Sequence, residues 1–325
     1  MIIAGDIGGT KTVLCLLSTE LDNSKTCVKE VTYASQQYAT FDAILADFLP
    51  DDAHITSACF GVAGPVVNQV CKTTNLPWLL DGQALKAKLN TSKVKLLNDL
   101  EAMALGMLYL PETDLIELNS NAVPQKGSCA VIAAGTGLGE ALLYWDEEKY
   151  HPMATEGGHT DFAAQTEQQD ALLKYLRQLT PGHVSYERIL SGVGFSHIYD
   201  FLCTQENAVP CKVVSQLTDD EDRNAVISAL GLAGKEAICV EALRLFVEIY
   251  GAEAGNLALK SLAIGGVFIG GGIGVKILPA MQSGQFMSAF KAKGRFEPML
   301  STLSVKLSIN QRTPLIGAIN FYSAS

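Results

Sequence analysis

Apolar residues occur along the chain in short runs, separated by glycine turns and by segments with helical spacing. Short apolar and β-branched runs are typical of buried strands, and apolar residues three or four positions apart are typical of amphipathic helices. The pattern predicts strands at 1–4, 13–17, 26–32, 55–62, 66–71, 93–97, 128–134, 140–145, from 264, and at 305–309. It predicts helices at 41–49, 81–89, 98–106, 167–179, 186–190, 194–203, over most of 221–262, at 275–287, and from 313. This alternation predicts an α/β fold.

The N-terminal layout of strand, glycine turn and strand returns in the second half of the chain. The first copy surrounds the turn from Gly5 to Thr12, and the second surrounds the turn from Gly135 to Gly139. Apolar runs on both sides of each turn predict a hairpin. Two such hairpins, each opening one half of the chain, indicate a duplicated α/β unit with a ligand between the copies.

Composition and charge narrow the functions of such a fold. With 325 residues, 48% of them apolar, the chain is long enough for about two domains. The net charge of −10 argues against nucleic acid as the main partner, because a basic surface is missing. The most apolar window, 261–275, is too short and too rich in glycine to span a membrane, and the N-terminal run lacks the features of a signal peptide. The eight cysteines form no C-x-x-C pair, so we expect free thiols in a reducing cytoplasm.

Three glycine turns are candidates for binding phosphate: Gly8-Gly9-Thr10, Gly135-Thr136-Gly137 and Gly270-Gly271-Gly272. Glycines permit positive φ and close approach of a ligand, and successive N–H groups in such turns bind anions. Asp6, beside the first turn, suits an anion site only if a cation lies between them. An ordinary hairpin with a solvated Asp6 explains the first turn as well, and close strand–helix packing explains the third. Neither a P-loop nor a G-x-G-x-x-G fingerprint occurs.

Several motifs together resemble one known family. They are Asp6-Ile7-Gly8-Gly9-Thr10, Leu97-Asn98-Asp99, Gly135-Thr136-Gly137, Glu156-Gly157-Gly158-His159, Ser185 to Gly192, Gly265 to Gly272 and Lys293-Gly294-Arg295-Phe296. Over nearly the whole chain, their order resembles that of bacterial glucokinases, which belong to the superfamily of actin-like sugar kinases, Hsp70 and actin ATPases. The resemblance implies two related actin-like (ribonuclease H-like) α/β domains around a central cleft. The small domain would comprise residues 1–109 plus 301–325, and the large domain residues 110–300.

The resemblance also implies an activity and a set of site residues. The enzyme would be a cytoplasmic homodimer that transfers the γ-phosphoryl group of ATP to O6 of glucose, giving glucose 6-phosphate and ADP. Asp99 would be the general base, and the sugar ligands would be Asn98, Asp99, Glu156, His159 and Glu187. The residues implied to bind ATP are Gly5, Asp6, Ile7, Gly8, Gly9, Thr10, Gly135, Thr136, Gly137, Gly270, Gly271 and Gly272. Asp6 would also hold Mg²⁺ through water.

The residues of the implied sugar site have structural interpretations as well. An ionised carboxylate such as Asp99 can accept the proton of a hydroxyl, while Asn98 and Glu101 match the pattern of a helix capping box. The two interpretations are compatible, because a cap at a strand–helix junction can present its neighbour to a ligand. Taken alone, His159 could be a loop histidine and Glu187 a surface residue.

One departure from the family pattern lies after the first turn. Lys11-Thr12 at this position is more usual in the sister ROK group of repressor-like sugar kinases, and Lys11 could either contact phosphate or be solvated. The ROK group carries a Cys-x-Cys-Gly-x-x-Gly-Cys zinc motif after its Glu-x-Gly-His, whereas residues 160–170 contain no cysteine. The sequence therefore favours the zinc-free glucokinase group.

Other functions stay open beside the glucokinase hypothesis. The alternatives are a kinase for a related hexose or amino sugar, a catalytically silent sugar-sensing regulator, and an ATPase of the actin or chaperone type. A regulator is disfavoured because Asp99 is intact and no DNA-binding segment precedes Met1. An ATPase would leave Glu156, His159 and Glu187 without a role.

Overall fold

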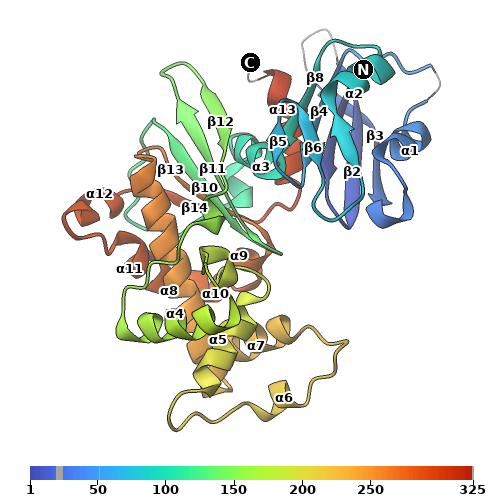
Figure 1. Cartoon of the computed structure of the whole chain (residues 1–325). Coiled ribbons are helices and arrows are strands. Elements are labelled where there is room, and N and C mark those ends of the chain that lie inside the picture. Colours follow the sequence, from blue (N-terminus) through green and yellow to red (C-terminus); the bar gives the residue numbers. More distant parts are fainter. Residues whose placement is uncertain (20–24, 51, 324–325) are drawn as a thin grey trace. The chain divides into compact units, whose positions relative to one another are not determined.

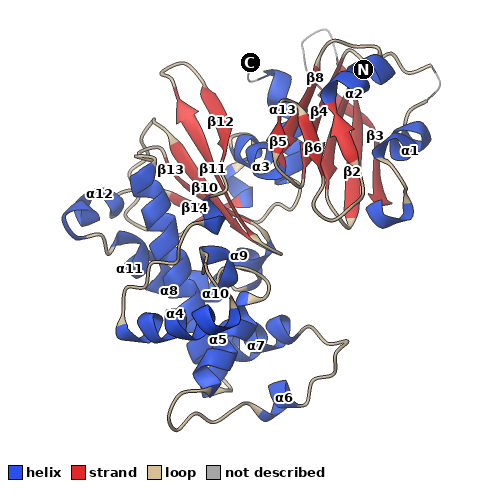
Figure 2. Cartoon of the chain, in the orientation of Figure 1, coloured by secondary structure: helices blue, strands red, loops and turns tan. Residues whose placement is uncertain are grey.

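The chain divides into two compact units, both of which combine sheets with helices (Figures 1 and 2). Unit 1 comprises Met1–Asp114, Leu143–Ala154 and Asn310–Ser325, and unit 2 comprises Leu115–Leu142 and Thr155–Ile309. The structure, a computed structural model, describes residues 1–19, 25–50 and 52–323. The protein therefore has the expected mixed α/β fold.

Unit 1 is built on a five-stranded sheet in the order β3-β2-β1-β4-β8. The strands are β1 (Ile2–Ile7), β2 (Lys11–Thr19), β3 (Lys25–Ala34), β4 (Ser57–Val62) and β8 (Val94–Asn98). β1 and β2 form the predicted antiparallel hairpin. β4 runs parallel to β1, and β8 runs parallel to β4. The carboxyl ends of β1, β4 and β8 consequently lie at one edge of the sheet.

Helices complete unit 1. They are α1 (Phe41–Phe48), α2 (Gly82–Leu89), α3 (Asp99–Met107) and α13 (Thr313–Asn320), with the 3₁₀ helices η1 (Ser35–Gln37), η2 (Glu112–Asp114) and η6 (Phe321–Ser323). α13, from the end of the chain, packs closely against α3 (Figure 1). A Cβ on Gly106 would lie 1.9 Å from the Thr313 carbonyl oxygen, and one on Gly317 would lie 1.8 Å from that of Ala102. Only glycines permit this approach, which supports the helix that begins at Asp99.

The alternating segment 66–71 forms two strands, so the prediction of one strand is wrong. β5 (Val66–Val67) pairs antiparallel with β6 (Val70–Lys72), and β7 (Leu79–Asp81) completes a small sheet. Asn68 and Gln69 between the strands have φ values of 52° and 61°. Two left-handed residues form a tight hairpin turn, and a two-residue turn leaves the alternating pattern intact. The pattern alone therefore could not reveal the turn.

A six-stranded sheet in the order β12-β11-β10-β13-β14-β9 contains the strands of unit 2, while β12 and the end of β11, from Leu143 on, fall in the segment assigned to unit 1. Its strands are β9 (Leu115–Glu117), β10 (Cys129–Ala134), β11 (Leu138–Trp145), β12 (Tyr150–Ala154), β13 (Gly266–Gly270) and β14 (Val305–Ser308). β10, β13 and β14 are parallel, and β9 is antiparallel to β14. β14 belongs to unit 2, whereas the sequence assigned 301–325 to the small domain. The division into domains at 109/110 and 300/301 stays a prediction.

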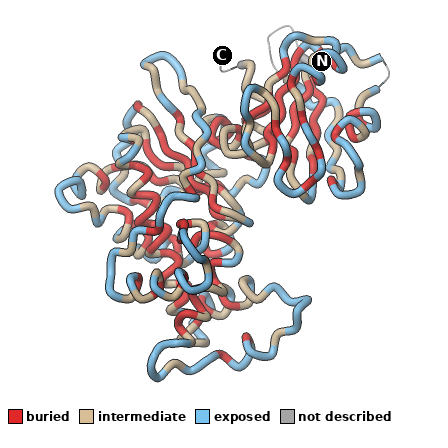
Figure 3. The backbone as a smooth tube through the Cα atoms, in the orientation of Figure 1, coloured by how far each residue is buried: buried red, intermediate tan, exposed pale blue. Residues whose placement is uncertain are grey.

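The helices of unit 2 surround a large apolar core. They are α4 (Glu167–Leu179), α5 (Gly194–Cys203), α6 (Lys212–Ser215), α7 (Arg223–Leu232), α8 (Ala237–Lys260), α9 (Gly272–Lys276), α10 (Leu278–Met281), α11 (Gln285–Lys291) and α12 (Glu297–Leu300), with the 3₁₀ helices η3 (Gly157–His159), η4 (Tyr186–Arg188) and η5 (Gly294–Phe296). α8 is buried over much of its length (Figure 3). No helix in the described ranges is both long enough and apolar enough to cross a membrane.

The helix predicted at 275–287 is divided among α9, α10 and α11 in the structure. Pro279 lies in the first turn of α10, where its missing N–H is tolerated. Gly284, with a φ of 90°, precedes α11. Proline and a left-handed glycine both interrupt a continuous helix, so the apolar spacing was correct for a helical region but not for one helix.

Candidate active site

The segments that follow strands β1, β4 and β8 of unit 1 lie next to one another. The strand register aligns Ile7 with Val62, and Val62 with Asn98. The Ala63 N–H donates to the Ile7 carbonyl oxygen at 3.0 Å, and Asn98 Nδ2 donates to the Gly64 carbonyl oxygen at 3.1 Å. The structure therefore brings the first glycine turn and the Asn98-Asp99 pair to the same sheet edge.

A capping box holds Asn98 and Asp99 at the start of α3. Asn98 Oδ1 accepts from the Leu100 N–H at 2.8 Å, and Glu101 Oε2 accepts from the Asn98 N–H at 2.9 Å. Asp99 is the first residue of the helix, is half-buried, and accepts from the Leu100 N–H at 3.0 Å. A carboxylate is favoured there by the positive end of the helix dipole. With these bonds made, Asn98 has at most one Nδ2 hydrogen and one Oδ1 lone pair for a ligand.

The first glycine turn needs glycine for packing rather than for φ. Neither Gly8 nor Gly9 has a φ in the left-handed range, which corrects the expectation from the sequence. A Cβ on Gly9 would lie 2.8 Å from Asn75 Cβ. The Gly8 N–H donates to the Lys11 carbonyl oxygen at 3.0 Å, and Ser35 Oγ donates to the Gly8 carbonyl oxygen at 2.8 Å. These contacts hold the turn tightly in place.

Asp6 lies next to this turn in an environment that disfavours its charge. Burial raises the pKa of Asp6 from 3.8 to about 6, and the Lys11 ammonium partly opposes the rise. A bound cation would stabilise the charged carboxylate, and Mg²⁺ prefers oxygen ligands. The surroundings of Asp6 therefore fit the metal that the resemblance implies.

A second cluster of potential metal ligands joins strands β2 and β3. Cys15, Cys27 and Glu30 have ligand atoms close to one another, and the two Sγ atoms are 3.2 Å apart. Burial and the Cys27 thiol raise the pKa of Cys15 to about 12, and Glu30 is paired with Arg312. Metals bind thiolate rather than thiol, so this cluster is poorly suited to a metal ion.

In unit 2 the second and third glycine turns follow neighbouring parallel strands. The register pairs Ala133 at the end of β10 with Gly270 at the end of β13. Gly271 has a φ of 79°, and a Cβ there would lie 2.2 Å from the Ala134 carbonyl oxygen, so the backbone requires glycine. At Gly135 or Gly272, a Cβ would meet no atom of the described residues within 4 Å. Packing therefore does not explain these two glycines, and their backbone is open to approach.

Two of the predicted sugar ligands lie against the second turn. Glu187, on η4, accepts from the Leu138 N–H through Oε2 at 3.0 Å. A Cβ on Gly137 would lie 2.5 Å from the same oxygen. Helix η3 directly follows Glu156 and ends at His159. His159 Nδ1 lies 4.0 Å from Glu187 Oε1. Unit 2 thus brings His159, Glu187 and the 135–137 turn together.

Two buried acids near this group were not singled out by the sequence analysis. Glu140 on β11 is 1% exposed, and Glu253 on α8 is fully buried. The available signal was a charged residue inside an apolar segment: Glu140 opens the run 140–145, and Glu253 lies among alanines and glycines. A buried charge needs a partner or a changed pKa, so an acid inside an apolar segment indicates a specific polar environment in the core.

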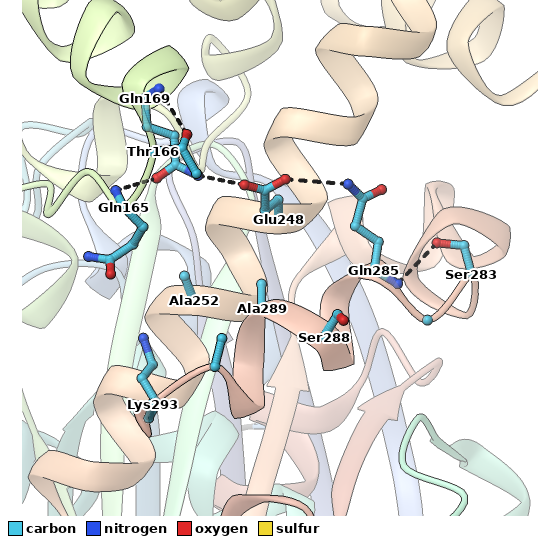
Figure 4. A pocket seen from close by; sticks show the side chains of 12 residues that line it. Gln165, Thr166, Gln169, Glu248, Ala252, Ser283, Gln285, Ser288, Ala289 and Lys293 are labelled. Atoms are coloured by element: carbon cyan, nitrogen blue, oxygen red, sulfur yellow. Dashed lines mark hydrogen bonds between the residues drawn. The ribbon is translucent and has the colours of Figure 1, made fainter. Parts of the chain in front are cut away.

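The cavity in Figure 4 is separate from the predicted residues. It has a volume of about 650 Å³ and lies among α4, α8 and α11 in unit 2. Its polar lining is largely engaged within the protein, because Gln169 and Gln285 donate to Glu248 at 2.8 and 3.4 Å. Lys293 at its margin donates to Asn256 Oδ1 at 2.7 Å. None of the residues predicted for sugar, nucleotide or metal is among those that line this cavity.

Comparison with known proteins agrees with the motifs. The glucokinase family model matches residues 3–325. A glucokinase of Nostoc sp. strain PCC 7120 is 38% identical, over 98% of this chain and 97% of the relative. The crystal structure of a glucokinase from an Antarctic psychrotroph is 28% identical with a TM-score of 0.84, over 100% of this chain and 99% of that one. A ROK family glucokinase from Streptomyces griseus, crystallised with glucose and AMPPNP, shares the fold at 19% identity and a TM-score of 0.64, over 98% of both chains.

The chain is a kinase-class α/β protein and belongs to the glucokinase family. The family resemblance read from the motifs is confirmed.

Proposed function

We propose that the chain is an ATP-dependent glucokinase, which transfers the γ-phosphoryl group of ATP to O6 of glucose and releases glucose 6-phosphate and ADP. The observation that carries the proposal is that, in a chain of the glucokinase family, two sheet edges each hold residues predicted for the active site. One edge holds Asp99 in a capped helix start, and the other holds His159 and Glu187 against a glycine turn. A carboxylate base and a set of sugar ligands are what phosphoryl transfer to a sugar needs.

Asp99 acts as the general base. Its carboxylate accepts the proton of the O6 hydroxyl while O6 attacks the γ-phosphorus and ADP leaves. The capping box supports this role, because the bonds of Asn98 and Glu101 hold the first turn of α3 in one conformation.

Glucose binds to Asn98, Asp99, Glu156, His159 and Glu187. Glu187 Oε2 is engaged by the Leu138 N–H, so we assign the other oxygen, Oε1, to the sugar. His159 Nδ1 lies 4.0 Å from that oxygen, which allows the two side chains to bind hydroxyls of one sugar. A carboxylate accepts from hydroxyls, and neutral imidazole both donates and accepts. Sugars lacking a hydroxyl would leave these groups unpaired.

ATP binds to the three glycine turns, and the open backbone at Gly135 and Gly272 supports this assignment. Asp6 holds Mg²⁺ through water, and the Lys11 charge beside it favours its ionised form. When bound, the metal shields the phosphate charge.

The proposal extends to the fold and the assembly. We infer two related actin-like (ribonuclease H-like) domains around a central cleft, a homodimer and a cytoplasmic location. The family resemblance is the support for each of these.

The test is release of ADP by the purified chain with glucose, mannose, glucosamine or no sugar, with and without Mg²⁺. We expect release to require both glucose and Mg²⁺. ADP release without sugar would instead favour an ATPase, and glucose binding without ADP release would favour a silent regulator. Faster turnover of another hexose would reassign the substrate.

A further inference from the structure

A buried carboxyl group packs directly against the loop that carries Glu156 and His159. A Cβ on Gly157 would lie 2.0 Å from Glu140 Oε2 and 2.9 Å from Glu140 Cδ. Gly157 does not have a φ in the left-handed range. Contact with Glu140, rather than backbone conformation, therefore requires glycine at this position.

The backbone of Glu140 also contacts the start of the loop. Thr155 Oγ1 donates to the Glu140 carbonyl oxygen at 2.9 Å and accepts from the Gly157 N–H at 3.1 Å. The neighbouring Gly158 packs on the same strand, since a Cβ there would lie 2.0 Å from the Leu138 carbonyl oxygen. The position of the loop is thus set by β11.

The Glu140 side chain also hydrogen-bonds Glu253 of α8. Glu253 Oε2 accepts from Asn256 Nδ2 at 2.8 Å, and Glu253 Oε1 accepts from Lys260 Nζ at 3.3 Å. Asn256 Nδ2 also lies 3.0 Å from the hydroxyl of Tyr186, the residue before Glu187. One buried network therefore connects to both segments that carry sugar ligands.

Two carboxyl groups can share a hydrogen bond only when one of them is protonated. Burial, followed by the charge of Glu253, raises the pKa of Glu140 to about 8, and Lys260 opposes the rise. The other titratable groups near the pair are Tyr250, which faces Glu140, and Tyr186 and Lys293, which face Glu253. Glu140 Oε1 has no hydrogen-bond partner among the described residues, which costs less for a neutral carboxyl than for a charged one. The raised pKa of Glu140 therefore favours Glu140 as the member of the pair that holds the proton.

We propose that Glu140 is a positioning residue for sugar binding: its buried carboxyl group, in contact with Gly157 and Glu253, holds the 156–159 loop so that Glu156 and His159 reach the sugar. The inference rests on the proposed function and adds to it a residue that does not touch the substrate. It predicts an effect on the KM for glucose with little effect on the KM for ATP.

A double-mutant cycle tests the contact. G157A should raise the KM for glucose by about 30-fold, because its Cβ collides with the Glu140 carboxyl, and E140A should raise it by about tenfold. In G157A/E140A the two nearest atoms, Oε2 and Cδ of residue 140, would be gone, and the Cβ of residue 140 would lie 3.2 Å away. The double variant should therefore be no worse than E140A. If the effects of G157A and E140A on the KM for glucose multiply in the double variant, the inference is overturned.

The variant E140Q tests the charge state, because glutamine is neutral at every pH and has nearly the same shape. The wild-type KM for glucose should rise as pH increases through about 8, where ionised Glu140 faces Glu253. E140Q should match the wild type within about twofold at pH 7 and should lose this alkaline rise. E206Q, at an exposed position, is the matched control and should keep the wild-type profile.

The outcomes separate this inference from the proposed function. A wild-type chain without glucose-dependent ADP release would overturn both. An active wild type whose E140Q variant keeps the alkaline rise would overturn only the role of Glu140. A rise in the KM for ATP equal to that for glucose in E140A would do the same, because it would indicate general loss of structure.

Discussion

The glycine turns at 8–10 and 135–137 are alike in sequence, yet their surroundings in the structure differ. In unit 1, Gly9 packs on Asn75, and Ser35 bonds the turn from the side, so the glycines serve close packing beside Asp6. In unit 2, Gly135 is open, whereas Gly137 packs on the carboxylate of Glu187. One turn is thus held next to an acid suited to a cation, and the other next to Glu187, a proposed ligand for sugar. A repeated motif does not give each of its glycines the same role, because the neighbouring segments decide that role.

The proposed base lies in unit 1 and most of the proposed sugar ligands lie in unit 2, and D99N is the strongest test of this difference. Removal of the carboxylate should lower kcat by about 10³-fold or more, since general base catalysis contributes 10²–10⁴-fold and proton transfer is then lost. The KM for glucose should change by only a few-fold. Steady-state ADP release and glucose titration measure the two effects.

The control for D99N is D42N, which removes an exposed acid from the first turn of another helix, α1. D42N should keep full activity. A D99N variant with near wild-type kcat would remove Asp99 from the role of base.

The substitution G137A sharpens the comparison within unit 2. The new Cβ would displace Glu187 Oε2 from its bond to the Leu138 N–H. Loss of a charged hydrogen bond costs about 1.5–3 kcal/mol, so kcat/KM for glucose should fall by about 10- to 100-fold. Steady-state kinetics measure this effect. An unchanged kcat/KM for glucose in G137A would contradict the link between the turn and Glu187.

Asp6 allows a test of the cation site in unit 1. Its folded pKa, about 6, is above the unfolded value of 3.8, so the folded protein binds the proton more tightly. The contribution of Asp6 to the stability of the ligand-free chain should therefore be fully present below about pH 4 and should be lost as pH rises through about 6. D6N should remove this decline and raise the free energy of unfolding at pH 7.5 by about 3 kcal/mol, while Mg²⁺-dependent activity falls.

Urea unfolding from pH 4 to 8 measures the D6N prediction. K11M is the informative companion, because Lys11 lowers the pKa of Asp6. K11M should move the decline to higher pH. A pH-independent difference between D6N and the wild type would argue against a titrating Asp6.

The smallest expected effect is that of G135A, at the open glycine of the second turn. A Cβ here meets no described atom within 4 Å, so the free energy of unfolding should change by less than about 0.5 kcal/mol. If phosphate approaches this backbone, the KM for ATP should rise by about three- to tenfold, since a methyl group would stand in its way. An unchanged KM for ATP would leave the open backbone without a nucleotide role.

Local features of the protein followed from the sequence alone. Apolar periodicity predicted the β1–β2 hairpin, and the spacing of Asn98 and Glu101 predicted the capping box, because these bonds join residues close in the chain. The motifs also identified the family, since their order along the chain does not depend on folding. Where a local signal was ambiguous, as with the turn at Asn68 and Gln69, the prediction failed.

Only the tertiary structure decided which residues meet. Parallel strands bring Gly64 to the side chain of Asn98, and η4 brings Glu187 to Gly137. The burial of Glu140 against Gly157 and Glu253, and with it the raised pKa, depends on a strand, a loop and a helix that are far apart in sequence. Periodicity reports the face on which a residue lies but not its partner across the core. That is why the sequence identified the family and its motifs, while the environment of each acid emerged only from the packing.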